Sequence, residues 1–213
     1  MATTTTYYGF DIPQSTDLVK DGATAIATLG QDIDTAMNTA LGTKKSGLVL
    51  LNTTSFSAVS SQSVSTIFTS TYQNYRVVIT LSSISAALTL RMRMRSGSTD
   101  ASGADYNGSF IRLPSGSTTV VGDYYGGNTS FDLTNALLST TGERNSLSFD
   151  LYNPQIARMT SMTSLDSEQL NSGGHNIVAR AAFHGVASAY DGFTLIASTG
   201  NMTGEVSTYG YNK

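Results

Sequence analysis

The residues able to do acid-base or nucleophilic chemistry are few and scattered. Only two histidines occur, His175 and His184, and glutamate stands only at Glu143, Glu168 and Glu205. A Ser-His-Asp triad assembles in space rather than in sequence, but the chain has no G-x-S-x-G segment to present a nucleophilic serine. The aspartates after position 47 fall mostly in or beside predicted turns, where Asp is favoured for backbone reasons. We therefore expect no paired-carboxylate glycosidase and no enzyme.

Cofactor and metal signals are equally weak. The absence of cysteine excludes a thiolate metal site. The segment Gly42–Ser46 resembles a phosphate-binding loop only superficially, because Lys44 stands where a glycine should precede the lysine and serine. The loop Asp100–Asn107 is rich in oxygen ligands but lacks the spacing of an EF-hand. We expect no cofactor and no metal, and a calcium ion in this loop stays open as the alternative.

A group of aromatic residues offers contact chemistry instead. Tyrosines stand beside Gly and Asn in the segment 123–128, and a further tyrosine precedes a glycine near position 106. Such tyrosines make adaptable, amphipathic contacts, and sugar rings stack on them. The alternative is that the rings lie on a sheet and only the hydroxyl groups face solvent. The candidate ligand contacts are Tyr106, Tyr124, Tyr125 and Asn128.

Arginine forms the sharpest charge feature. Arg91, Arg93 and Arg95 alternate with apolar residues in a predicted strand, and Arg76 is a candidate fourth member. Like charges on one face repel unless something compensates them. We expect pairing with acidic turns or exposure on an edge strand, and a subunit contact or an anionic ligand remains the alternative.

Composition narrows the classes further. Of 213 residues 39% are hydrophobic and only 13% are charged, while serine and threonine make up about 28%, well above their usual share. Twelve Lys and Arg against fifteen Asp and Glu argue against nucleic-acid binding. No apolar run is long enough to span a membrane, and no signal peptide is visible. Low charge with many hydroxyl groups favours an all-β protein that presents a surface.

The segment 15–41 is the only convincing helical stretch. Ser15, Thr16 and Asp17 offer N-cap oxygens, and Gly42 is a plausible stop. Apolar and small residues follow spacings of three and four, typical of a coiled-coil seam. One interpretation is an amphipathic helix that lies on its own domain, and the other is a short oligomeric coiled coil. The candidate oligomerisation residues are Val19, Ile26, Leu29, Ile33 and Ala36.

Before this helix, residues 1–14 form a short arm that is too small for a core of its own. It carries Tyr7, Tyr8 and Phe10. Three exposed aromatic side chains would make a costly apolar patch, so we expect the arm to dock on another surface.

From about residue 47 the apolar period changes from that of a helix to that of a strand. Alternation is clearest in Leu88–Arg95, whereas Leu48–Leu51, Ile177–Phe183 and Phe193–Ala197 read as strands buried on both faces. Eight to ten strands separated by turn signals predict a sandwich or jelly roll. The chain is thus expected to be mainly β: an attachment arm and one short α-helix in residues 1–46, then an antiparallel β-sandwich, jelly-roll-like, in residues 47–213.

Two stretches resemble known proteins. Residues 8–35, with an aromatic-Gly-aromatic start, a proline and the segment Asp17-Leu18-Val19-Lys20-Asp21-Gly22-Ala23, resemble a segment of tailed-bacteriophage virion proteins of the tail-fibre or minor tail type. The stretch 193–211 is similar, more weakly, to the closing hairpin of phage β-sandwich domains. The resemblance implies a homotrimer in the virion, assembled in the host cytoplasm, whose N-terminal part contacts other virion proteins. It also implies a projecting jelly roll that binds host surface polysaccharide.

Two functions follow as expectations. In the first, the arm residues Tyr7, Tyr8 and Phe10 attach the chain to the virion, the helix trimerises, and loops such as Tyr124–Asn128 contact host glycan. In the second, the protein is a purely architectural subunit, such as a capsid decoration or head fibre, a collar or a baseplate component, without receptor binding.

Overall fold

The chain divides into two units close to the position where the sequence period changes. The computed structural model describes residues 3–6, 9–12, 19–42, 47–134, 145–169 and 175–212. The first unit is Met1–Gly47 and the second is Leu48–Lys213. This border lies one residue from the expected one.

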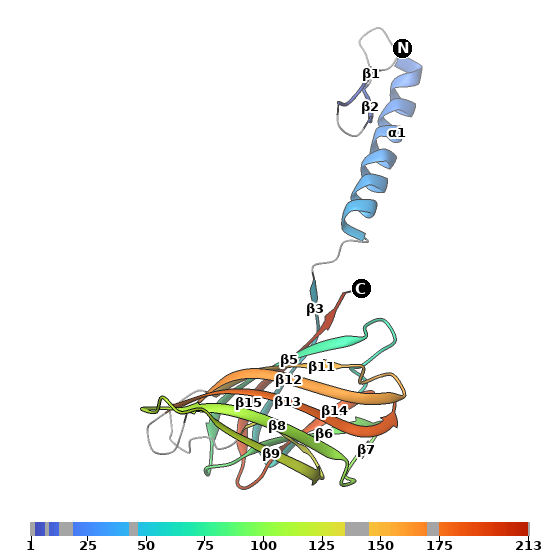
Figure 1. Ribbon diagram of the computed structural model, residues 1–213. Coiled ribbons are helices and arrows are strands. Elements are labelled where there is room, and N and C mark those ends of the chain that lie inside the picture. Colours follow the sequence, from blue (N-terminus) through green and yellow to red (C-terminus); the bar gives the residue numbers. More distant parts are fainter. Residues whose placement is uncertain are drawn as a thin grey trace. The chain divides into compact units, whose positions relative to one another are not determined.

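The first unit contains a small hairpin and one long helix (Figure 1). Strand β1 (Thr3–Thr4) pairs with β2 (Asp11–Ile12), and the backbone N–H of Thr5 donates to the carbonyl of Phe10. Gly9 has a φ of +68°, a conformation that glycine adopts without strain, and this allows the chain to reverse there. Helix α1 covers Val19–Met37 and continues as a π-helical turn, Asn38–Gly42. Strand β2 contacts α1, so the arm folds back on the helix of its own unit.

The predicted seam of α1 is divided between two environments. Gly22, Leu29 and Ala36 are half-buried, whereas Ile26 is 66% exposed and Ile33 is 40% exposed. The two isoleucines lie seven residues apart, so they share one face of the helix. An apolar stripe on the helix therefore remains uncovered in the single chain.

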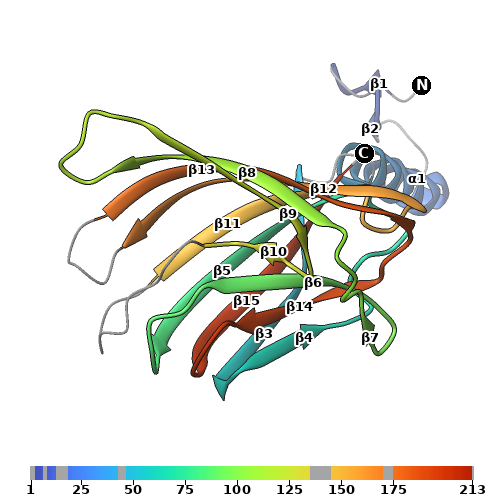
Figure 2. The ribbon, with the colours of Figure 1, turned by 60° about the horizontal axis from the view of Figure 1, so that its bottom comes forward.

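The second unit is built on two antiparallel sheets, one of which has eight strands. In this larger sheet strands that are far apart in sequence lie side by side, since the last strand of the chain lies between β3 and β5 (Figure 2). In order across the sheet the strands are β3 (Leu48–Val59), β15 (Met202–Tyr211), β5 (Asn74–Ile84), β11 (Asn145–Tyr152), β12 (Arg158–Gln169), β13 (His175–Ser188), β8 (Tyr106–Pro114) and β9 (Val121–Asn128).

The smaller sheet completes a jelly roll. Its strands are, in order, β10 (Phe131–Asp132), β6 (Leu90–Ser96), β14 (Gly192–Ala197) and β4 (Ser61–Val64), with β7 (Thr99–Asp100) paired to β6. Along the chain β3, β4, β5 and β6 alternate between the larger and the smaller sheet, and β10, β11, β14 and β15 return in the mirrored order. This order is that of a jelly roll. The hairpins β8–β9 and β12–β13 are additions that widen the larger sheet. The sequence prediction of a mainly β chain with an antiparallel sandwich is confirmed.

The core lies between the two sheets and follows the strand period. On β5 every second side chain is buried, and on β6 the methionines alternate with the arginines in the same way. The largest fully buried side chains come from both sheets and are Tyr75, Tyr106, Phe131, Phe149, Phe193, Ile79, Leu81, Leu90, Met92, Met94 and Leu133. At about 25 cal/mol per Å² of apolar surface, this burial is the main stabilising term of the unit.

Two of the three β6 arginines form the ion pairs that the sequence led us to expect, although β6 lies between β10 and β14 and is not an edge strand. Arg91 forms an ion pair with Asp132 at 3.0 Å, and Arg95 with Asp100 at 2.5 Å. Arg93 donates from Nε to the carbonyl of Thr129 at 3.0 Å. Arg76 is not a fourth member of this group, because β5 belongs to the other sheet.

Two of the three strand segments expected to be buried on both faces are buried on only one. Burial alternates along Leu48–Leu51 and along Ile177–Phe183, whereas Phe193–Ala197 is buried apart from the half-buried Ile196. The position of each strand explains this difference in burial. Strand β14 lies between β4 and β6, and its outward Thr194 is covered by the Arg95–Asp100 pair. Strands β3 and β13 instead turn one face away from the core.

Tyr106→Phe tests the packing of the core. The Tyr106 hydroxyl accepts from the backbone N–H of Met94 at 3.0 Å and donates to the carbonyl of Ala101 at 2.8 Å. Removing it takes a partner from the buried Met94 N–H and from the partly buried Ala101 carbonyl. We therefore expect a loss of about 1–3 kcal/mol in unfolding free energy, measured by urea denaturation. Tyr124→Phe is the control, because that side chain is exposed, and it should change stability by less than about 0.5 kcal/mol. Equal losses in the two variants would contradict this account.

Candidate functional site

One row of side chains crosses the outer face of the larger sheet, the face turned away from the smaller sheet. The strand registers align one residue from each of the eight strands. We call this set the outer row, and in order from β3 to β9 it is Leu50, Tyr209, Arg76, Asp150, Thr163, Ala181, Ser109 and Tyr124. Because neighbouring residues alternate between the faces of a strand, none of these side chains enters the core.

The outer row forms the floor of a groove. Its middle members Thr163, Ala181 and Ser109 are small, while the adjacent rows carry larger side chains such as Leu165 and Phe183. Three hollows follow the row. One of about 420 Å³ lies at Arg76 and Asp150, one of about 280 Å³ at Ala181 and Ser109, and one of about 590 Å³ at Ser109 and Tyr124. The three hollows are separate, and we call the outer row together with these hollows the groove.

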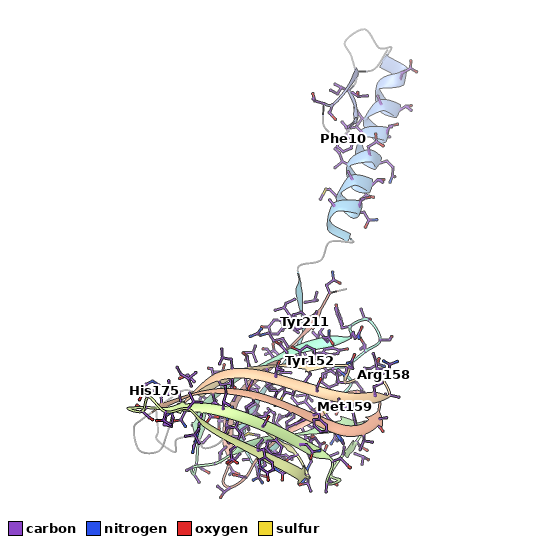
Figure 3. The ribbon with its side chains drawn as sticks, in the orientation of Figure 1. Phe10, Tyr152, Arg158, Met159, His175 and Tyr211 are labelled. Atoms are coloured by element: carbon purple, nitrogen blue, oxygen red, sulfur yellow. The ribbon has the colours of Figure 1, made fainter. Side chains whose placement is uncertain are left out.

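The β5–β11 end of the groove is polar. Arg76 donates from Nη2 to the Ser148 hydroxyl at 3.1 Å, and its Nη1 lies 3.9 Å from Asp150 Oδ1. The same oxygen of Asp150 accepts from the Tyr211 hydroxyl at 2.7 Å. Burial, followed by the hydrogen bond to Asp150, raises the pKa of Tyr211, so this phenol stays protonated and donates. Figure 3 shows Tyr211 close to the C-terminal end of the chain.

The edge of the polar end is formed by Tyr152, whose hydroxyl lies 3.1 Å from the Thr163 hydroxyl. Figure 3 labels Tyr152 and Met159 on the second unit. Met159 also lines the 590 Å³ hollow. Strand β12 thus contributes Met159 to the 590 Å³ hollow and Thr163 to the 420 Å³ hollow.

The tyrosine cluster expected from the sequence is divided by the sheet. Tyr124 is 82% exposed on the outer face and lines the 590 Å³ hollow. Tyr106 is fully buried, and its ring packs edge-on against Phe131. The expectation that Tyr106 contacts a ligand is therefore wrong. The physical reason is that Tyr106 begins β8 on the core side, where its hydroxyl satisfies backbone groups of β6 and the following loop.

Tyr125 and Asn128 do not join Tyr124 either. Tyr125 follows Tyr124 directly in β9, so the two side chains point to opposite faces. The Tyr125 ring packs over Gly108, where an added Cβ would approach its hydroxyl to 2.7 Å, and burial raises its pKa to about 12. Asn128 donates to Asp132 at 3.5 Å. Of the predicted ligand contacts, Tyr124 is exposed on the outer face, and the half-buried Tyr125, which packs against the core, also lines the 590 Å³ hollow.

A bulge at the end of β9 determines how the side chains of the β8–β9 hairpin are placed. The register between β8 and β9 shifts between Tyr106 and Gly108, and Gly127 takes a φ of +68° there. The Asn107 side chain accepts from the Gly127 N–H at 3.2 Å and also lines the 590 Å³ hollow. A glycine is required because a side chain at this φ would be strained.

The histidines do not form a catalytic pair. His184 is buried between two tyrosine rings, 4.2 Å from the Tyr106 ring and 5.4 Å from the Tyr190 ring, and its Nε2 lies 3.0 Å from the Tyr190 hydroxyl. Burial lowers the pKa of His184. His175 is exposed at the opposite end of β13 (Figure 3).

The carboxylates also differ from the turn positions expected for them. Asp166 and Glu168 lie inside β12 on the core side, and both pair with Arg180 of β13. Burial raises the pKa of Asp166. In the segment Asp100–Asn107, Asp100 is held by Arg95 and Thr194. Among the described residues no group of three or more acidic or histidine side chains is placed to hold a metal ion.

The predicted attachment residues are only partly visible. Tyr7 and Tyr8 lie outside the described residues, and Phe10 is half-buried at the end of the β1–β2 hairpin. Val19 begins α1. In the described part of the chain no helix is both long and apolar enough to cross a membrane.

Comparison with known proteins finds no matching family model and no matching curated protein.

Sequence reasoning missed the polar end of the groove, although a signal for Asp150 was present. In the stretch Leu147–Leu151 the apolar residues alternate with serine and Asp150, which places Asp150 opposite the core. Arg76 and Tyr211 carried no such signal, because they join Asp150 only through pairings of β5 with β11 and β15.

The buried His184 predicts a pH dependence of stability. Its folded pKa is lowered, so unfolding takes up a proton once the pH falls below about 6.5, the unfolded value, and stability is lost as the pH falls. We expect the melting temperature to fall between pH 7.5 and pH 5.5, and to fall less in His184→Phe. His175→Gln should keep the wild-type slope, because His175 is exposed. Parallel slopes for wild type and His184→Phe would refute the assignment.

Proposed function

We propose that the chain is a non-enzymatic structural protein of a bacteriophage virion. It acts as a trimeric tail fibre or baseplate-associated fibre. The N-terminal unit attaches to other virion proteins and joins three copies, and the jelly roll presents the groove to glycan on the host surface.

The observation that carries this proposal is the uncovered stripe on α1. In proteins most helical stability comes from packing of an amphipathic face, and exposed isoleucines at a heptad spacing gain most by packing against the same stripe of other copies. Strand β2 contacts α1 but leaves part of the helix uncovered, as the exposure of Ile26 and Ile33 shows.

The groove supports the adhesive part of the proposal. It combines an exposed tyrosine ring with hydroxyl groups, an arginine and a carboxylate on an open sheet face. Jelly rolls occur in both viral capsid and lectin domains. Because a fold does not imply a function, the shared fold supports adhesion only in combination with the groove.

A second candidate function is favoured by the aliphatic side chains beside the groove. Leu165 is 71% exposed and Ile111 is 57% exposed, and both lie on the outer face. Exposed apolar patches often mark protein contacts. In this alternative the chain is a purely architectural virion subunit, such as a head decoration, collar or baseplate component, and the outer face packs on neighbouring subunits.

A glycan array separates the two functions. The full-length protein is applied to bacterial surface polysaccharides, and the adhesion proposal expects binding to a subset of them. Binding to none would refute host-glycan adhesion and favour the architectural role.

The helix stripe predicts the oligomeric state. Wild type should have about three times the chain mass of 22.5 kDa in light scattering. Ile26→Asp combined with Ile33→Asp should give monomers with an unchanged β-rich circular dichroism spectrum, because charges cannot enter the seam. The matched control is Thr28→Asp with Thr35→Asp, which has the same spacing and charge on another face of the helix. A monomeric wild type would remove the coiled-coil proposal.

The arm predicts incorporation into particles. Deleting residues 2–14 removes the hairpin and Tyr7, Tyr8 and Phe10 while leaving the jelly roll intact. We expect a soluble protein that is missing from purified particles, measured by quantitative immunoblotting against a major capsid protein. Normal copy number of the truncated chain would show that attachment lies elsewhere.

A further inference from the structure

The polar end of the groove carries unused hydrogen-bonding capacity of both signs. Asp150 Oδ1 accepts from Tyr211, whereas no hydrogen bond reaches Asp150 Oδ2 within the described part of the chain. The Arg76 side chain is 40% exposed. Its Nη2 donates to Ser148, and the Tyr211 hydroxyl also lies beside the guanidinium, which acts to lower the pKa of that phenol against the larger effect of burial. The Arg76 Nη1 lies 3.9 Å from Asp150, which is beyond hydrogen-bonding distance. A donor and an acceptor thus stand side by side in a hollow of about 420 Å³.

This pairing of charges selects against charged ligands. A carboxylate or phosphate group at Arg76 would meet the negative charge of Asp150, and an ammonium group or metal ion at Asp150 would meet the guanidinium of Arg76. A neutral diol has neither problem, because one hydroxyl can donate to Asp150 Oδ2 while its neighbour accepts from Arg76 Nη1. Hydrogen bonds to charged groups are also the stronger ones.

The remainder of the groove fits a chain rather than a single ring. From Arg76 on β5 to Tyr124 on β9 there are five strand steps, or about 24 Å at about 4.8 Å per step. The floor between them offers a methyl group at Ala181 and hydroxyl groups at Thr163 and Ser109. The exposed Tyr124 ring gives an apolar face at the far end.

We infer that the groove binds a neutral, extended polysaccharide that lies across the strands, with a sugar diol held between Arg76 and Asp150 and a later sugar stacked on Tyr124. This inference rests on the proposed function, which it makes specific: it names the class of glycan and its direction of binding.

The test uses the full-length protein and an array of neutral and uronic-acid-containing bacterial polysaccharides, followed by titration calorimetry. The calorimetric probes are a disaccharide and a hexasaccharide cut from the strongest neutral binder. Asp150→Asn should weaken hexasaccharide binding at least tenfold. Asp132→Asn is the matched control, because Asp132 also pairs with an arginine but lies in the smaller sheet, and it should change affinity less than twofold.

Ligand length gives the second readout. Tyr124→Ala should weaken the hexasaccharide severalfold and leave the disaccharide unchanged, because a disaccharide held at Arg76 is too short to reach Tyr124. Circular dichroism of each variant shows that the sheets remain folded.

The outcomes separate the inference from the proposed function. Neutral-glycan binding that none of the groove substitutions weakens would overturn the groove assignment and leave adhesion in place. Preference for uronic acids, strengthened by Asp150→Asn, would overturn the neutral-ligand assignment. A lower mass of Asp150→Asn in light scattering would show that a second copy of the chain occupies the groove, which also overturns it. If no polysaccharide binds wild type, the adhesive function and the inference fail together.

Discussion

The register of the larger sheet is the constraint on which the rest of the second unit depends. Strand β5 pairs on one side with β15 and on the other with β11, and its alternate residues fill the core. A slip of one residue would turn Val77 and Ile79 outward and bring Arg76 into the core, where an unpaired charge is very costly. Burial of the apolar residues therefore also fixes which side chains stand on the outer face. The groove follows from the packing of the core.

Polar groups on the core side reinforce that register where the sheet is widened. Asp166, Glu168 and Arg180 can pair only while β12 and β13 keep their alignment. A buried ion pair of this kind contributes little net stability, because removing its charges from water offsets their attraction. Its consequence is specificity: a shifted hairpin would leave these charges unpaired. The β12–β13 hairpin, which widens the outer face, is thus held in register by charges buried on its other side.

Local pattern was sufficient for the classes of structure and insufficient for the site. The helix with its exposed isoleucines, the mainly β second unit and the alternation of arginine with methionine along β6 all follow from the pattern within short segments. The groove does not, because its residues come from eight different strands, and their meeting depends on non-local pairings such as β15 with β5. The misplacement of Tyr106 has a related cause. A tyrosine near Gly and Asn reads as a loop contact, and only the opposite sheet, which supplies the Met94 N–H, shows why its hydroxyl is buried.

The two units have complementary consequences under the proposed function. An open groove on a sheet face excludes little water, so a single groove is expected to bind sugar weakly, as hydroxyl groups exchange one set of hydrogen bonds for another. Linking several grooves through one seam changes this, because after the first binding event the others occur at a high effective concentration. The weak apolar stripe of α1, with glycine and alanine beside its isoleucines, would then affect the strength of adhesion as well as assembly. It would set how many grooves act together, and adhesion would depend on residues far along the chain from any sugar.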